Sequence, residues 1–233
     1  QPIISTSSLR VHGFEALARL PEGTPAICDL LDMAAETGNL RTMDLALSWM
    51  KRLRHFNGIT ISAVQGWCVG GGILVAGLCD LSVAASNARF SLSEINFAVI
   101  PGAGLTWMVA RHLPRKVALY YLLTGQVFDG RKAAEIGLVN HVVPVADLSG
   151  EIDRLSTDLA AKDRHAAVAI KRVFERSVEM DFDEAVEWES AKFFELSYTS
   201  RQKWLDVALQ GFSNRKFKPA LENYTTIGNR NIE

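Results

Sequence analysis

Among the residues of this 233-residue chain whose types and spacing could do chemistry, the first are three consecutive glycines, Gly70, Gly71 and Gly72. Consecutive glycines allow a sharp turn and let a ligand approach the backbone N–H groups closely. The apolar run Ile73–Leu78 that follows is typical of a short helix, whose start has unpaired N–H donors and the positive end of the helix dipole. Such a place stabilises a developing oxyanion. A tight turn between a strand and a helix, with no ligand, explains the glycines about equally well.

A second segment surrounds Glu94, the one acidic residue between Asp80 and Asp129. Its neighbours are mostly apolar, namely Leu92, Ile95, Phe97, Val99 and Ile100. Apolar surroundings raise the pKa of a carboxyl group, which suits a general acid or base near neutral pH. For an isolated glutamate, however, a surface position in a loop is the more frequent explanation.

The elements that would position these two segments alternate between strands and helices. Apolar spacing predicts strands at Ile59–Val64, Leu81–Ala85, Phe90–Ser93 and Leu138–Val143, with one or two more within residues 1–27. It predicts helices at Asp29–Arg54, Ile73–Leu78, Ala103–His112, Lys116–Leu123 and Arg131–Ile136, the last capped by Asp129, and a glycine-rich turn at Gly66–Gly72. From about Leu148 to Gly211 it predicts three or four amphipathic helices. This order indicates an α/β fold with a helical C-terminal lobe.

Composition excludes several other classes of protein. Lys and Arg total 25 and Asp and Glu total 26, so the net charge of −1 gives no global attraction to nucleic acid or to a membrane surface. The longest uncharged stretch, Phe56–Cys79, contains polar residues and glycines and is not a membrane span. The start of the sequence has no signal-peptide pattern. We therefore expect a cytoplasmic protein without nucleic-acid or membrane partners.

Other distinctive side chains receive structural interpretations. The three cysteines have no paired spacing and the five histidines share no helical or strand spacing, so we expect reduced thiols and no metal site. Trp67 and Trp107 flank the two segments and are interpreted as core residues rather than as contacts for a substrate.

Taken together, the two segments follow the order strand, three glycines, helix, strand, acid, Pro-Gly-Ala-Gly and helix. In this order the chain resembles the crotonase superfamily of enoyl-CoA hydratases and isomerases. The resemblance extends from about Leu45 to Tyr224 and rests on Gly66–Gly72, Cys79–Ala84, Ser93–Asn96, Ile100–Gly104, Leu122–Gly125 and Lys132–Asn140. Within the superfamily the likeness is closest to the hydroxycinnamoyl-CoA (feruloyl-CoA) hydratase-lyases, which have a similar glycine motif, a Ser-Glu-Ile-Asn motif and a tyrosine pair, here Tyr120 and Tyr121.

The resemblance implies a spiral of β-β-α units with a C-terminal helical lobe that mediates contacts in a homotrimer or hexamer. It divides the chain into an atypical N-terminal segment at 1–40, an α/β core at 41–145 and the helical lobe at 146–233. The N-terminal part is shorter than in the family. Its opening is faintly similar to cyclic-dinucleotide phosphodiesterase domains of the EAL type, at Gln1–Ile4, Gly13–Arg19 and Ala35–Gly38, but no room remains for that fold's barrel.

The resemblance also implies functional residues. The N–H of Gly71 would hold the enolate-like thioester oxygen, and Glu94 would be the single catalytic carboxylate. Leu74 stands where simple hydratases carry a first glutamate, so it would contact substrate without moving protons. The remaining candidates are Ser93, Phe97 and Gly102 around the acyl group and Lys216 and Lys218 near CoA. The substrate is an acyl-CoA thioester, and no separate cofactor is expected.

Three positions depart from the family pattern. Ser190 stands where the lyases use a tyrosine to hold the substrate's phenol, and Phe97 replaces an expected tryptophan. The motif for a second oxyanion donor is matched only by Pro25–Leu30, which has no corresponding glycine. The resemblance as a whole still implies an acyl-CoA hydratase or hydratase-lyase. An enoyl-CoA isomerase, which also needs one glutamate, and a non-catalytic acyl-CoA-binding or scaffold protein remain alternatives.

Overall fold

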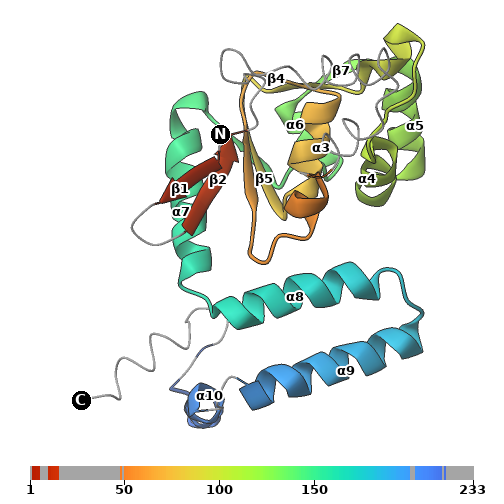
Figure 1. The fold of residues 1–233 in the computed structure, drawn as a ribbon. Helices are drawn as coiled ribbons and strands as arrows, with labels where there is room; N and C mark the ends of the chain where they lie inside the picture. The colour runs from red at the N-terminus through yellow and green to blue at the C-terminus, as the bar shows by residue number, and fades with distance from the viewer. Residues whose placement is uncertain are drawn as a thin grey trace. The chain divides into compact units, whose positions relative to one another are not determined.

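The computed structural model describes residues 2–5, 10–15, 48, 50–199, 203–216 and 218 (Figure 1). The chain divides into two compact units, Gln1–Arg154 and Leu155–Glu233. The first unit contains the described strands together with the glycine run and Glu94, and the described elements of the second unit are helices.

A five-stranded sheet forms one layer of the first unit. Its order is β1 (Pro2–Ser5), β2 (Arg10–Glu15), β3 (Ile61–Val64), β5 (Leu81–Ala85) and β8 (His141–Val143). The β1–β2 pair is antiparallel and the other pairs are parallel. The predicted strands within residues 1–27 and at Leu81–Ala85 are thus confirmed. The prediction at Ile59–Val64 forms a strand over its last four residues, and that at Leu138–Val143 over its last three.

A smaller sheet of three-residue strands positions the candidate site. It has the order β4 (Trp67–Val69), β6 (Arg89–Ser91) and β7 (Val127–Asp129). Its middle residues are buried, and Phe90 stacks on Phe128 with ring centroids 5.5 Å apart. The prediction of a turn throughout Gly66–Gly72 was wrong at β4, and β7 was not predicted.

Short helices connect and cover these strands. They are α3 (Gly71–Leu78), η1 (Ser93–Phe97), α4 (Leu105–His112), α5 (Arg115–Thr124), α6 (Gly130–Glu135) and η2 (Val145–Asp147). The core between α3 and α4 includes Ile73, Met108 and Val109, all fully buried. As predicted, Asp129 caps α6, since its Oδ1 accepts a hydrogen bond from the N–H of Lys132 at 2.8 Å.

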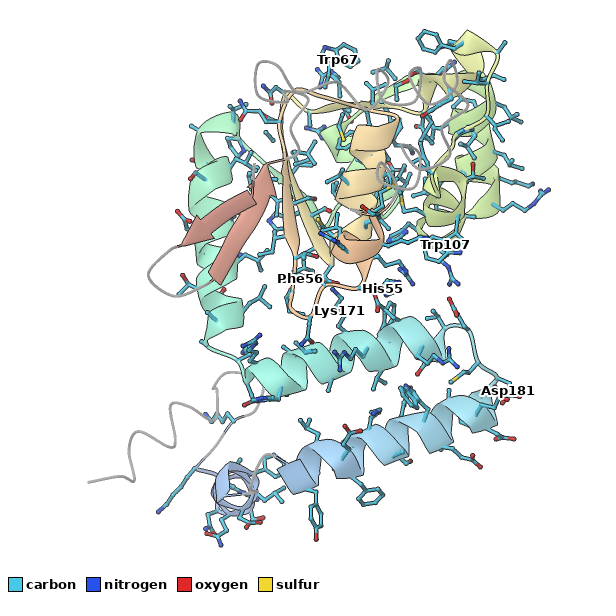
Figure 2. All side chains as sticks on the ribbon, in the orientation of Figure 1. His55, Phe56, Trp67, Trp107, Lys171 and Asp181 are labelled. Atoms are coloured by element: carbon cyan, nitrogen blue, oxygen red, sulfur yellow. The ribbon has the colours of Figure 1, made fainter. Side chains whose placement is uncertain are left out.

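Neither flanking tryptophan is a core residue, which corrects the prediction. Trp67 is 60% exposed and points away from the small sheet (Figure 2), because it occupies the outward face of β4. Trp107 is 40% exposed, and the guanidinium carbons of Arg54 and Arg111 each lie 4.4 Å from the centre of its ring. Cation–π contact of this kind stabilises an aromatic ring at a surface.

The C-terminal part is helical, in agreement with the sequence. The described helices there are α7 (Leu148–Ala160), α8 (Arg164–Ser177), α9 (Phe182–Thr199) and α10 (Lys203–Ser213). Helices α8 and α9 run side by side as an antiparallel hairpin (Figure 1). This hairpin leaves large apolar side chains exposed, including Phe174, Phe182, Phe193, Phe194 and Tyr198. Among the described helices, none is both long and apolar enough to cross a membrane.

Candidate active site

The small sheet brings together the two segments that the sequence singles out. Strands β4 and β6 are parallel neighbours, with Val69 paired to Ser91. Since parallel strands end at the same edge, the glycine run after β4 and η1 after β6 leave the sheet side by side. The N–H of Gly70 donates a hydrogen bond to the carbonyl oxygen of Ser91 at 3.1 Å, which holds the two segments together at that edge.

Glu94 lies in η1 with its carboxylate against the glycine run. A Cβ atom placed on Gly70 would lie only 2.6 Å from Oε1 of Glu94. The other carboxylate oxygen, Oε2, is buried and has no hydrogen-bond partner within the described part of the chain. A buried polar atom left unpaired typically costs about 1–3 kcal/mol, so its presence calls for an explanation such as a bound ligand or water.

Two features favour glycine at position 70. Its backbone angles, φ 50° and ψ −114°, are unfavourable for any residue with a side chain. A side chain there would also collide with the Glu94 carboxylate. The sequence interpretation gave a function to Gly71 and none to Gly70. The number of glycines was the available signal for a role of Gly70, because a single oxyanion donor does not require three consecutive glycines.

Gly71 is the first residue of α3 and offers an N–H group at an open position. The earliest hydrogen bonds into this turn run from the N–H groups of Ile73 and Leu74 to the carbonyl oxygen of Gly70, at 2.9 and 3.3 Å. The N–H groups of Gly71 and Gly72 therefore precede the intrahelical ladder. No neighbouring heavy atom lies within 4 Å of a Cβ placed on Gly71. The helix start thus presents donors, with the positive end of its dipole, next to the Glu94 carboxylate.

The remaining predicted residues of the first unit occupy different environments. Ser93 begins η1 and is half-buried beside Glu94, whereas Phe97 ends η1 and is 77% exposed. Gly102 lies in the following loop, where its carbonyl oxygen accepts the N–H of Leu105 at 3.0 Å. Leu74 is 2% exposed and belongs to the hydrophobic core. Contacts of these side chains with substrate stay predictions.

Other candidates lie in the second unit or outside the described residues. Lys216 and Lys218 are exposed and follow α10, and Ser190 is exposed on α9. Their predicted relations to CoA and to the acyl group stay predictions. The segment Pro25–Leu30, considered for the second oxyanion donor, and most of the EAL-like residues lie outside the described residues.

The cysteines near the site do not supply a nucleophile. Burial raises the pKa of the Cys68 thiol to about 12, so it stays protonated at neutral pH. Cys68 and Cys79 are both buried, and neither forms a disulfide within the described part of the chain. Among the described residues, no group of three or more His, Cys, Asp or Glu side chains could hold a metal ion. The chemistry available at this edge is therefore proton transfer by Glu94 and hydrogen bonding by backbone amides.

The chain is similar to several known proteins. The family model "Enoyl-CoA hydratase/isomerase" matches residues 28–220. Hydroxycinnamoyl-CoA hydratase-lyase of Pseudomonas fluorescens is 34% identical over 181 residues, which cover 77% of this chain and 66% of that protein. The 2,3-dehydroadipyl-CoA hydratase of Escherichia coli is 33% identical, over 78% of this chain and 72% of the relative.

Solved structures give the same fold. An enoyl-CoA hydratase of Mycobacterium smegmatis matches with a TM-score of 0.70 and 26% identity, over 81% of this chain and 73% of that chain. A Geobacillus kaustophilus protein described as enoyl-CoA hydratase subunit I matches with a TM-score of 0.71 and 31% identity, over 80% and 72%. The chain spans about two thirds of the length of the first curated relatives it matches. It belongs to the enoyl-CoA hydratase/isomerase family and has the crotonase fold.

Proposed function

We propose that the protein is an acyl-CoA hydratase or hydratase-lyase that acts on an enoyl-CoA thioester through an oxyanion-stabilised enolate. The observation that carries the proposal is the position of the Glu94 carboxylate, which contacts Gly70 and has one buried, unpaired oxygen. A general base needs a free acceptor within reach of the proton it removes. The adjacent Gly71 N–H supplies a donor for the thioester oxygen.

Hydration proceeds in two proton transfers through one carboxylate. Glu94 removes a proton from a water molecule while the water oxygen forms a bond to the β-carbon of the enoyl group. Electrons move from the double bond to the thioester oxygen, where the Gly71 N–H stabilises the negative charge. Glu94 then returns the proton to the α-carbon, which regenerates both the thioester carbonyl and the free carboxylate. A single glutamate is therefore sufficient.

Lyase chemistry uses the same two groups in a further step. Glu94 removes the proton of the β-hydroxyl group, the bond between the α- and β-carbons breaks, and an aldehyde leaves. The electron pair again passes to the thioester oxygen near Gly71, and protonation of the α-carbon gives acetyl-CoA. The relative named hydroxycinnamoyl-CoA hydratase-lyase supports this option. Exposed apolar residues that end or follow η1, such as Phe97, Val99 and Ile100, are suitable contacts for an acyl or aryl group.

The test is incubation with crotonyl-CoA, 2,3-dehydroadipyl-CoA and feruloyl-CoA, followed by mass detection. Hydratase activity adds the mass of one water, and lyase activity gives acetyl-CoA and an aldehyde. An isomerase instead gives a product of unchanged mass with a shifted double bond. Binding of all three thioesters without turnover would contradict the proposal and would support the non-catalytic alternative.

We also propose that the protein forms a homotrimer or hexamer in the cytoplasm. The exposed apolar side chains on α8 and α9 support assembly, because large exposed apolar surfaces mark interaction sites. The cysteine pattern supports the location, since three cysteines without paired spacing suit a reducing compartment. A monomer in light scattering at micromolar concentration would contradict the assembly.

A further inference from the structure

Ser91, the last residue of β6, forms hydrogen bonds in two directions. Its carbonyl oxygen accepts the N–H of Gly70 at 3.1 Å. Its hydroxyl group, on a side chain that is 3% exposed, donates to the carbonyl oxygen of Gly125 at 3.0 Å. Ser91 therefore joins the glycine run to the C-terminal end of α5, and it does so three residues before Glu94.

The same end of α5 contacts η1 beyond Glu94. Gly125 caps α5 in the left-handed conformation, with φ 59° and ψ 17°. A Cβ atom placed on Gly125 would lie 2.8 Å from Nδ2 and 3.0 Å from Oδ1 of Asn96. The Asn96 side chain is thus pressed against the bare backbone of Gly125, two residues after Glu94.

These two contacts matter because apolar packing does not fix η1. No residue of η1 is buried, and Ile95, Asn96 and Phe97 are exposed. A short, largely exposed helical turn has little hydrophobic stabilisation and adopts several positions unless other contacts hold it. In this chain the Ser91 hydroxyl group bonds to Gly125 two residues before η1 begins, and the Asn96 side chain lies against the same glycine near the end of η1.

We propose that Ser91 and Asn96 are positioning residues that set the place of the Glu94 carboxylate relative to the Gly71 N–H, with Gly125 as their common anchor. The inference rests on the proposed function, because the position matters only if the two groups act on one substrate. A misplacement of about 1 Å costs on the order of 10²-fold in rate when two groups act together. Neither side chain needs to touch the substrate for this effect.

The first test replaces the Ser91 hydroxyl group. We expect Ser91→Ala to lower kcat for an enoyl-CoA thioester about 10- to 100-fold with little change in KM, because binding survives while geometry is lost. Ser62→Ala is the matched control. Ser62 is also buried, at the centre of the larger sheet, and its hydroxyl group donates to Ser82 Oγ at 2.6 Å. We expect it to lower Tm comparably and to leave kcat unchanged.

The second test displaces Asn96 from the other side. Gly125→Ala places a methyl group where the Asn96 amide lies, and we expect kcat to fall at least as far as in Ser91→Ala. Gly137→Ala is its control, since Gly137 also has a positive φ, of 84°, but a Cβ there would have only an ordinary contact, 3.7 Å from His112 O. Both variants place a side chain at a positive φ, and only the first should affect turnover.

Crystal structures of wild type and Ser91→Ala test the inference independently of any activity measurement. The positioning role predicts a larger distance, or a wider spread of positions, between the Glu94 carboxylate and Gly71 N in the variant. An unchanged distance overturns the inference even if the wild type is an active hydratase. A changed distance in a wild type that turns over no thioester supports the positioning geometry and rejects the proposed function. Equal loss of kcat in Ser91→Ala and Ser62→Ala also overturns the inference, because the effect would then be general destabilisation.

Discussion

Each of two parallel strand pairs in the first unit has a carboxylate beside it, and the two carboxylates differ in their hydrogen bonding. Beside the β3–β5 pair, Oδ2 of Asp80 accepts the backbone N–H of Thr60 at 2.7 Å and its hydroxyl group at 2.9 Å. Beside the β4–β6 pair, Oε2 of Glu94 is buried without a hydrogen-bond partner in the described structure. The satisfied carboxylate stabilises the fold, whereas the unsatisfied one remains available for a substrate.

The same contrast holds for the hydroxyl groups of the two pairs. Ser62 and Ser82 hydrogen-bond to each other across β3 and β5, and Ser82 also donates to the carbonyl oxygen of Ala76 at 2.7 Å. Ser91 on β6 instead donates to Gly125, at the edge where Glu94 lies. The polar groups of the larger sheet bond within the sheet and to α3, whereas Ser91 of the smaller sheet bonds to the end of α5 beside the candidate site.

The largest expected effect comes from closing the open position at Gly71. Its φ is not in the positive range and no neighbouring heavy atom lies within 4 Å of an added Cβ, so Gly71→Val should fold. The side chain would instead block the approach of the thioester oxygen to the N–H group. We expect turnover to be lost and the affinity for CoA esters to fall, as measured by kinetics and calorimetry.

Gly72→Ala is the matched variant for this prediction. A Cβ atom on Gly72 would meet Cys68 Sγ at 3.5 Å, which is ordinary van der Waals contact. We expect a much smaller loss of turnover than in Gly71→Val. If folded Gly71→Val binds and turns over CoA thioesters normally, Gly71 is only a turn residue, and the scaffold alternative is favoured.

Asp80→Ala should give the opposite result to a change at the site. The substitution leaves the N–H of fully buried Thr60 without its acceptor, which costs about 1–3 kcal/mol of stability. We expect a lower Tm in thermal unfolding with turnover retained by the folded protein. Loss of turnover with an unchanged Tm would remove the distinction between the two carboxylates.

A smaller effect is expected at the ion pairs of Glu151. Hydrogen bonds from Arg154, at 2.9 and 2.7 Å, and one with His141, at 2.8 Å, lower the pKa of its carboxyl group from 4.5 to about 2. A lowered pKa means that the carboxylate contributes stability above pH 4.5 and loses that contribution as the pH falls towards 2. The Tm difference between wild type and Glu151→Gln should therefore shrink over this range. A difference independent of pH would contradict the assignment.

Sequence reasoning singled out the two segments by their order along the chain, because neither three glycines nor one acid in apolar surroundings is decisive alone. It also placed the Asp129 cap, since that signal is local. It missed β4, whose residues it assigned to the glycine-rich turn, and β7, and it gave no separate role to Gly70. The contacts of Gly125 with Ser91 and Asn96 join residues far apart in the chain, and no local pattern predicts them.

The central claim is that the unpaired Glu94 carboxylate is the single acid/base of an enoyl-CoA reaction. The most direct measurement is kcat of wild type and Glu94→Gln on the best thioester of the panel, with Tm recorded for both. Because the variant keeps the shape of the side chain and loses the base, we predict a fall in kcat of about 10²–10⁴-fold with Tm unchanged or higher. A variant that retains kcat within about threefold, well below the usual acid/base contribution, would contradict the claim.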